Sequence, residues 1–138
     1  MSNDAILIEK LNRMLKQEHA CAIRYATHAA VVTGPASEPI RARLKEISAD
    51  EIEHAEKLRD RIVALGGKPT LEISLEDLKE AYDLDTILKI NMREEADAIA
   101  SYTEILEMIP PSNAILYDTI RDILEGEQEH MEELSNLR

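Results

Sequence analysis

The sequence predicts an all-α protein, a four-helix bundle in which a long crossover joins two antiparallel helical hairpins. The composition is typical of long helices, because hydrophobic residues make up 44% of the 138 positions, Phe and Trp are absent, and only four Gly and five Pro interrupt the chain. Apolar residues recur every three or four positions in four long segments. The connections between these segments are short, long and short, as in bundles with one crossover. A single domain, residues 1–138, is expected.

Glycine and proline mark the ends of the first two predicted helices. The first helix covers about residues 4–32 and stops before a Gly-Pro pair that begins at Gly34. The second covers about residues 37–66 and ends at Gly66 and Gly67, with a proline in its first turn. Because the connection between them is short, the two helices should form an antiparallel hairpin.

The second pair of helices follows a long connection. Ser74 within that connection offers a capping start for about two turns of helix. The third predicted helix covers about residues 85–109 and stops before Pro110 and Pro111, and the fourth runs from Ser112 almost to the C-terminus. The short turn at the two prolines predicts a second antiparallel hairpin.

Each predicted helix carries an apolar stripe that charged residues interrupt. The second and fourth helices have a Glu followed three residues later by a His on the stripe, and the first and third have one Glu each. The stripe of the third helix is the least regular, because Asn91 and Ser101 also fall on it. The six charged positions are Glu18, Glu51, His54, Glu94, Glu127 and His130.

Equal spacings support this set. The separation from Glu18 to Glu51 equals that from Glu94 to Glu127, at 33 residues, and 76 residues separate each member of the first hairpin from its counterpart in the second. The site therefore has the spacing of a duplicated hairpin. Ion pairs with Arg24, Arg43, Arg61 or Arg121 are the alternative explanation for buried glutamates, but they leave the repeated spacing unexplained.

Four carboxylates facing one axis, with no Lys or Arg on the same stripe, repel one another unless protons or metal ions neutralise them. Two divalent cations supply the required charge, and the chain's net charge of −12 favours cations in general. Glu and His three residues apart lie on one face of a helix. Oxygen and imidazole ligands suit iron, manganese or zinc. Di-iron four-helix bundles use this ligand set, and six ligands shared by two ions leave positions open for an oxidant or water.

The segments around these residues resemble the bacterioferritins. QEHACAIRY, at residues 17–25, is similar to the first-helix segment of that family, and DEIEHAEKLRDRIVALGGKP, at residues 50–69, is similar to its second. The resemblance covers residues 6–137 and matches all six ligand positions. It implies a ferritin-like bundle that oxidises Fe2+ with O2 or H2O2 and stores the product inside a hollow shell.

The resemblance also implies roles for individual residues. Glu51 and Glu127 would bridge two irons, and the two separate sites would be completed by the remaining ligands, namely Glu18 with His54 and Glu94 with His130. Tyr25, seven residues after Glu18, is expected to be a packed core residue that hydrogen-bonds a ligand carboxylate or donates an electron. Asp50 is expected either on the helix surface or as a partner that holds an imidazole N–H.

The sequence departs from the bacterioferritin pattern at three places. The family has a haem-ligating Met after the first bridging Glu, where this chain has Ile52, so haem is not expected. Glu46 stands in the stretch where some members carry a His that gates iron. The sequence up to Arg138 offers no segment for the family's short fifth helix, so that helix is not expected. We therefore expect a homo-oligomer, at least a dimer paired through the outer faces of the first two helices; the alternative is a shell whose channels differ from those of the family.

Charge, the N-terminal segment and the single cysteine predict the partners and the cellular compartment of the protein. The acidic charge excludes nucleic acid and anionic membrane surfaces as expected partners. The N-terminus lacks signal-peptide features, no apolar run is long enough to span a bilayer, and a lone cysteine forms no internal disulfide, so a reducing cytoplasm is expected. Cys21 is interpreted as a small core residue, and His19 and His28 as surface histidines.

Two other functions fit the residues less well. One is a rubrerythrin-like peroxidase or a dimanganese catalase, although the chain contains no Cys-x-x-Cys pair and no additional core Glu of the rubrerythrin kind. The other is a helical interaction module with a purely structural metal site. Six ligands for two ions argue against the module, because structural sites usually saturate their metal with protein ligands.

Overall fold

The computed structural model describes residues 3–138 and confirms the all-α class. Its four long helices are α1 (Asn3–Val31), α2 (Ser37–Ala64), α3 (Leu84–Met108) and α4 (Ala114–Asn136), with one short 3-10 turn, η1 (Leu75–Asp77). The helix ends lie within about two residues of the predicted ones. No helix within this part of the chain is long and apolar enough to cross a membrane.

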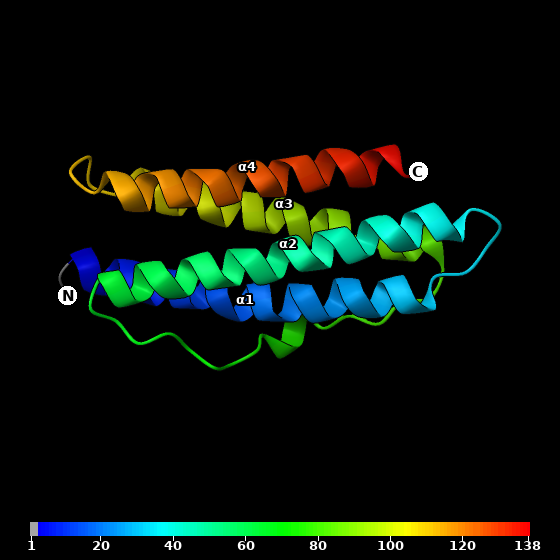
Figure 1. Cartoon of the computed structure of the whole chain (residues 1–138), viewed down its shortest axis with the longest axis horizontal. Helices are drawn as coiled ribbons and strands as arrows, with labels where there is room; N and C mark the ends of the chain where they lie inside the picture. Colours follow the sequence, from blue (N-terminus) through cyan, green and yellow to red (C-terminus); the bar gives the residue numbers. More distant parts are fainter. Residues whose placement is uncertain (1–2) are drawn as a thin grey trace.

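The helices form two antiparallel hairpins, α1 with α2 and α3 with α4 (Figure 1). The crossover leaves the end of α2 and passes along α1 to the opposite end of the bundle, where α3 begins. As a result α1 and α4 run in one direction and α2 and α3 in the other. This topology brings the middle of all four helices together.

Local chemistry explains where the helices start and stop. Asp83 and Asn113 cap α3 and α4, because their side chains accept hydrogen bonds from the backbone N–H of Thr86 and Leu116. At the end of α2, Gly66 has a φ of +88°, a conformation that side chains other than that of glycine rarely adopt. The next residue, Gly67, donates from its backbone N–H to Ile62 O at 2.9 Å and closes the helix.

The crossover differs from the prediction. Ser74 does not start two turns of helix: only the single turn η1 follows it, and the Ser74 hydroxyl donates to Asp77 Oδ2 at 2.6 Å instead of capping. Half-buried His19 helps to hold this segment, since its Nδ1 donates to Glu72 O at 2.7 Å and its Nε2 accepts from Arg59 at 2.8 Å.

A buried polar network attaches the end of the crossover to α1 and α3. Arg24 is 2% exposed and donates from Nε to Asn91 Oδ1 and from Nη1 to Asp77 O, both at 2.9 Å. The Asn91 amide donates to His28 Nδ1 at 2.9 Å, and His28 Nε2 donates to Lys79 O at 2.7 Å. The prediction that His28 lies on the surface is therefore wrong, because its bond to the crossover carbonyl buries it. Burial lowers the pKa of His28, so the ring is neutral.

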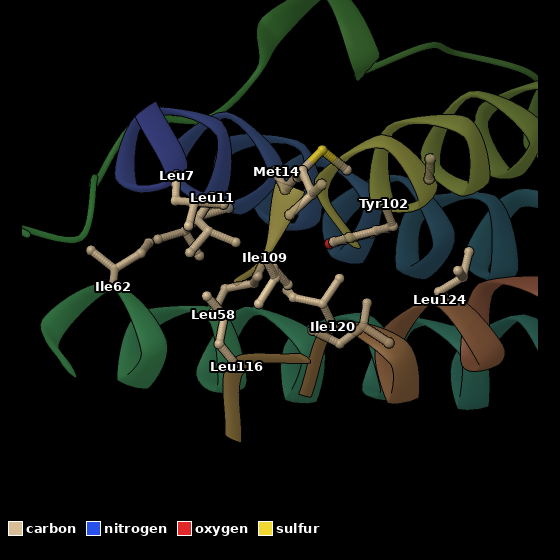
Figure 2. Packing of buried hydrophobic residues seen from close by; sticks show 14 of the residues in the cluster. Leu7, Leu11, Met14, Leu58, Ile62, Tyr102, Ile109, Leu116, Ile120 and Leu124 are labelled. Atoms are coloured by element: carbon tan, nitrogen blue, oxygen red, sulfur yellow. The ribbon is translucent and has the colours of Figure 1, made fainter. Parts of the chain in front are cut away.

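The apolar core consists of two clusters at opposite ends of the bundle. Figure 2 shows the one at the N-terminal end of α1, where side chains from all four helices interlock. Its labelled members are Leu7, Leu11, Met14, Leu58, Ile62, Tyr102, Ile109, Leu116, Ile120 and Leu124. The second cluster contains Tyr25 and Cys21, which confirms the interpretation of that cysteine as a core residue. Charged residues occupy the middle of the bundle, between the clusters.

Candidate metal centre

Six charged residues were predicted on the stripes of the four helices. The five on α1, α2 and α4 meet in the middle of the bundle. Their exposure is at most 7%, although each carries an ionisable side chain. They are Glu18, Glu51, His54, Glu127 and His130. Ionisable groups are almost never buried to this degree unless they are paired or bind metal.

The sixth prediction, Glu94, is wrong, since the structure brings the adjacent Glu95 into the cluster. Glu94 turns toward the crossover, where it pairs with Lys79 and lies 3.9 Å from Arg24 Nη1. Both residues are buried, but the residue that reaches the centre lies four positions after Asn91, not three. Successive residues of a helix point about 100° apart, so one face of α3 presents Glu95 to the centre and another presents Glu94 to the crossover.

A signal for Glu95 was present in the sequence. Tyr102 follows Glu95 by seven residues, as Tyr25 follows Glu18, and both tyrosines are fully buried. The repeat between α1 and α3 is thus 77 residues, one more than the 76 between α2 and α4. The predicted equal spacing misplaced the ligand because it assumed one offset for both pairs of helices.

The carboxylates surround the two imidazoles in two groups that share members. His54 Nδ1 lies 3.1 Å from Glu18 Oε2, 3.2 Å from Glu51 Oε1 and 3.3 Å from Glu127 Oε1. His130 Nδ1 lies 3.0 Å from Glu95 Oε2, 3.2 Å from Glu127 Oε1 and 3.5 Å from Glu51 Oε1.

Glu51 and Glu127 belong to both groups, and the centroids of the two rings are 6.0 Å apart. Within each group, one ligand atom of every residue lies within 4.8 Å of the others. Two adjacent ions that share a pair of carboxylates fit this arrangement.

Burial and mutual repulsion hold protons on these carboxylates. Burial raises the pKa of Glu18 well above its ordinary value, and the charges of Glu51 and Glu127 raise it further. The pKa of Glu95 is raised in the same way, by burial and then by Glu127 and Glu51. Burial and the facing Glu127 raise the pKa of Glu51 to about 7.

The imidazoles respond in the opposite direction. Burial disfavours their charged form, but the surrounding carboxylates outweigh it, raising the pKa of His130 to about 11 and that of His54 well above its ordinary value. Burial likewise favours a raised pKa for Glu127, yet the adjacent His130 and His54 lower it to about 2. Without metal, imidazolium ions and retained protons neutralise the centre.

Several buried oxygens in the centre have no hydrogen-bond partner. They are both carboxylate oxygens of Glu51 and of Glu127, one of Glu95, and the hydroxyls of Tyr25 and Tyr102. The ion pairs of residues 3–138 join none of the six clustered groups to Lys or Arg; Arg43, for example, pairs with Glu46 and Glu133. Carboxylate oxygens that are buried without donors fit a metal site, and they argue against the ion-pair alternative.

Three residues beside the centre complete its surroundings. Asp50 accepts a hydrogen bond from His130 Nε2 at 2.9 Å, which confirms the expectation that it holds an imidazole N–H. The Tyr25 hydroxyl lies among these groups without a partner; burial raises its pKa, and the charge of Glu95 raises it further. For Tyr102 the corresponding carboxylate is Glu18. Each half of the centre therefore has one buried tyrosine beside it.

The fold and the buried carboxylate–histidine groups are those of ferritin-like di-iron proteins. Residues 8–138 match the ferritin family through its ferritin-like domain, so the chain belongs to this family. Its relatives include a bacterioferritin from Brucella melitensis biotype 1, 29% identical over 108 residues. That match covers 78% of this chain and 66% of the relative, just under two thirds of its length.

Two solved structures extend the comparison. A ferritin-like diiron-carboxylate protein from Bacillus anthracis strain Ames is 32% identical, with a TM-score of 0.92 and 99% of both chains covered. A dodecameric thioferritin from Bacteroides fragilis, described as bacterioferritin-related, is 27% identical with a TM-score of 0.88, covering 96% of this chain and 84% of that one. Similarity in sequence and similarity in structure therefore both lead to proteins described as bacterioferritins or as related to them.

Proposed function

We propose that this protein is a ferroxidase, which binds two Fe2+ ions between its four helices and transfers their electrons to O2 or H2O2. The observation that carries the proposal is the sharing of Glu51 and Glu127 between two buried ligand groups. Family membership and the similarity to a diiron-carboxylate protein support iron as the metal. The same oxygen and nitrogen ligands also accept manganese or zinc.

In the proposed centre each residue has one role. Glu51 and Glu127 bridge the two ions, Glu18 and His54 complete one position, and Glu95 and His130 complete the other. The two imidazoles bind through Nδ1, the nitrogen that faces the carboxylates. Iron replaces the protons that neutralise the metal-free centre, so loading releases protons and weakens as the pH falls.

The reaction is balanced by two irons. Two Fe2+ ions give one electron each, and H2O2 with two protons becomes two water molecules; with O2 and two protons, the product is H2O2. The protein's part is to hold both ions within reach of one oxidant molecule in a site screened from bulk water. Tyr25 belongs to the proposed catalytic set as a buried phenol beside Glu95 that donates a hydrogen bond or an electron.

Self-association belongs to the proposal as well. Exposed apolar side chains of α1, α2 and the crossover surround a pocket of about 520 Å3, with Ile52 58% exposed and Leu71 95% exposed. Apolar patches of this kind mark interaction surfaces. Together with the dodecameric relative, they support a homo-oligomer that pairs through α1 and α2. An assembly that encloses a cavity would add iron storage to ferroxidase activity.

Anaerobic titration followed by oxidation tests the function. The protein should bind two Fe2+ per chain and oxidise both when air or H2O2 is added, faster than free iron is oxidised. Disproportionation of H2O2 by the manganese-loaded protein without turnover of iron would instead identify a dimanganese catalase. Metal that is bound but never oxidised by either oxidant would identify a structural site.

A further inference from the structure

The internal repeat of the centre fails at one position next to the metal ligands. Positions of α2 and α4 that are 76 residues apart are equivalent, since they place Glu51 with Glu127 and His54 with His130. Fully buried apolar residues follow the same offset, as in the pairs Ile47–Ile123, Leu44–Ile120 and Leu58–Leu134. Asp50, by contrast, corresponds to Gly126.

Asp50 fixes the imidazole of His130. Its Oδ2 lies 2.9 Å from His130 Nε2, so the proton of a neutral ring stays on Nε2 and the lone pair of Nδ1 points at the carboxylates. A carboxylate partner of this kind orients a metal-ligating histidine and strengthens it as a ligand. The His130 side chain is also the better buried of the two, at 3% exposed against 9% for His54.

His54 lacks the equivalent support. A Cβ atom at position 126 would lie 3.0 Å from His54 Nε2 and 3.3 Å from Cε1, so the ring packs directly against the glycine backbone. Among the hydrogen bonds of residues 3–138, none involves His54 Nε2. The nitrogen that Asp50 holds in one half of the centre therefore has no protein acceptor in the other half.

Pockets at the surface also reach the His54 half of the centre. Glu18, the terminal carboxylate of the His54 half, lines the apolar pocket on α1 and α2 and also a polar pocket of about 350 Å3 bounded by α1, η1 and α3. Four more carboxylates line the polar pocket together with Arg13, those of Glu76, Asp77, Glu94 and Asp97, and Glu94 among them pairs with Lys79. The remaining excess of carboxylates favours cations near Glu18.

We propose that the two metal positions are unequal: the Glu95–His130 position holds its ion tightly, and the Glu18–His54 position is the exchangeable one, where ions arrive and leave. This inference rests on the proposed dinuclear centre but not on its ferroxidase activity. Loss of a partner that orients a ligand typically costs about 10- to 100-fold in metal affinity. The two positions should differ by a similar factor.

Anaerobic titration with Co2+, followed by calorimetry and by visible absorption, tests the inference without iron oxidation. The wild-type chain should bind two Co2+ in two steps, about 10- to 100-fold apart. Asp50→Ala should weaken the first step by a similar factor and leave the second unchanged. Asp50→Asn should have a smaller effect in the same direction. Glu53→Ala, which removes one carboxylate from the exposed side of α2, should change neither step.

Gly126→Ala provides the reciprocal test, because the added Cβ crowds His54 and not His130. It should weaken the second step alone. Equal affinity for both ions in the wild-type chain would overturn the inference, and so would equal weakening of both steps, or of neither, in Asp50→Ala and Asp50→Asn. Two equal steps with rapid Fe2+ oxidation would leave the proposed function standing, whereas absence of any binding would remove both. Circular dichroism verifies that each variant is folded.

Discussion

Glu94 and Glu95 are neighbours in the chain with separate environments, and a matched pair of variants distinguishes them. Glu95 lies 3.0 Å from His130 Nδ1, whereas Glu94 pairs with Lys79 and Arg24. Glu95→Gln should reduce Fe2+ binding from two ions per chain to one, because it removes a terminal ligand. Glu94→Gln should retain both ions. Anaerobic titration measures the number of Fe2+ ions bound by each variant. Loss of an ion only in Glu94→Gln would support the prediction from the apolar stripe that Glu94 is the ligand.

Substitution of a carboxylate that both ligand groups share should remove two ions, not one. Glu51→Ala or Glu127→Ala should abolish binding of both ions, because each carboxylate belongs to both ligand groups. Both variants should still fold, since removal of one of four mutually repelling carboxylates relieves the metal-free centre. The readout is the number of Fe2+ ions bound under anaerobic conditions. A variant that retains one tightly bound ion would contradict the bridging role.

The protons of the metal-free centre predict how its stability depends on pH. Glu18, Glu51 and Glu95 have raised pKa values, as do both histidines, so the folded chain binds more protons at neutral pH than the unfolded chain. A group whose pKa is higher in the folded chain contributes its full stabilisation of the fold below its ordinary pKa, which is 4.5 for Glu and 6.5 for His. This contribution is lost as the pH rises through the pKa of the group in the folded chain. Glu127, with its pKa lowered to about 2, does not titrate above pH 5.

The metal-free protein should therefore become more stable as the pH falls from 8 to 5, by on the order of a few kcal/mol. Urea denaturation at several pH values, in the presence of a chelator, measures the change. With Fe2+ under anaerobic conditions the dependence should reverse, because metal binding requires deprotonated ligands. A free energy of unfolding that is independent of both pH and metal would contradict the assignment of these protons.

At the level of elements, the network around Arg24 connects the crossover to the bundle. Asn91→Ala should lower the free energy of unfolding by about 2–4 kcal/mol, because it leaves Arg24 Nε and His28 Nδ1 without partners in a buried site. Urea denaturation measures the loss. Lys10→Ala, which removes an exposed ion pair with Glu104, serves as the control and should cost less than about 1 kcal/mol.

The crossover offers a second readout of the same variant. Because its carbonyls at Asp77 and Lys79 bind to Arg24 and His28, the segment should become more sensitive to proteolysis in Asn91→Ala. Equal stability and equal proteolysis in Asn91→Ala and Lys10→Ala would show that the network contributes nothing to anchoring.

For the whole molecule, the outer face of α1 and α2 predicts the assembly. Ile52→Glu should dissociate the proposed dimer or the pairs within a larger assembly, because it puts a charge into the apolar contact. Ile115→Glu is the matched control: Ile115 is 65% exposed on α4, outside that pocket. Size exclusion with light scattering gives the mass of each species. An unchanged mass in Ile52→Glu would place the contact elsewhere.

Much of this protein was predictable from the sequence because its helices are long and regular. The apolar period, the Gly and Pro positions and the lengths of the connections predict four helices, two hairpins and one crossover. The repeated Glu and His positions predict five of the six clustered residues, since residues on one stripe of a straight helix face the same way.

The apolar stripe alone did not decide between neighbouring residues, and the tertiary structure did. Glu94 and Glu95 both lie on the buried arc of α3, and the rotation of that helix against α1 and α4 turns Glu95 to the centre. The bonds of His28 and Arg24 join segments about 50 to 70 residues apart, and they depend on where the crossover lies. The local period of a helix specifies which arc is buried, but the partner of each side chain is specified by the packing of other helices against that arc.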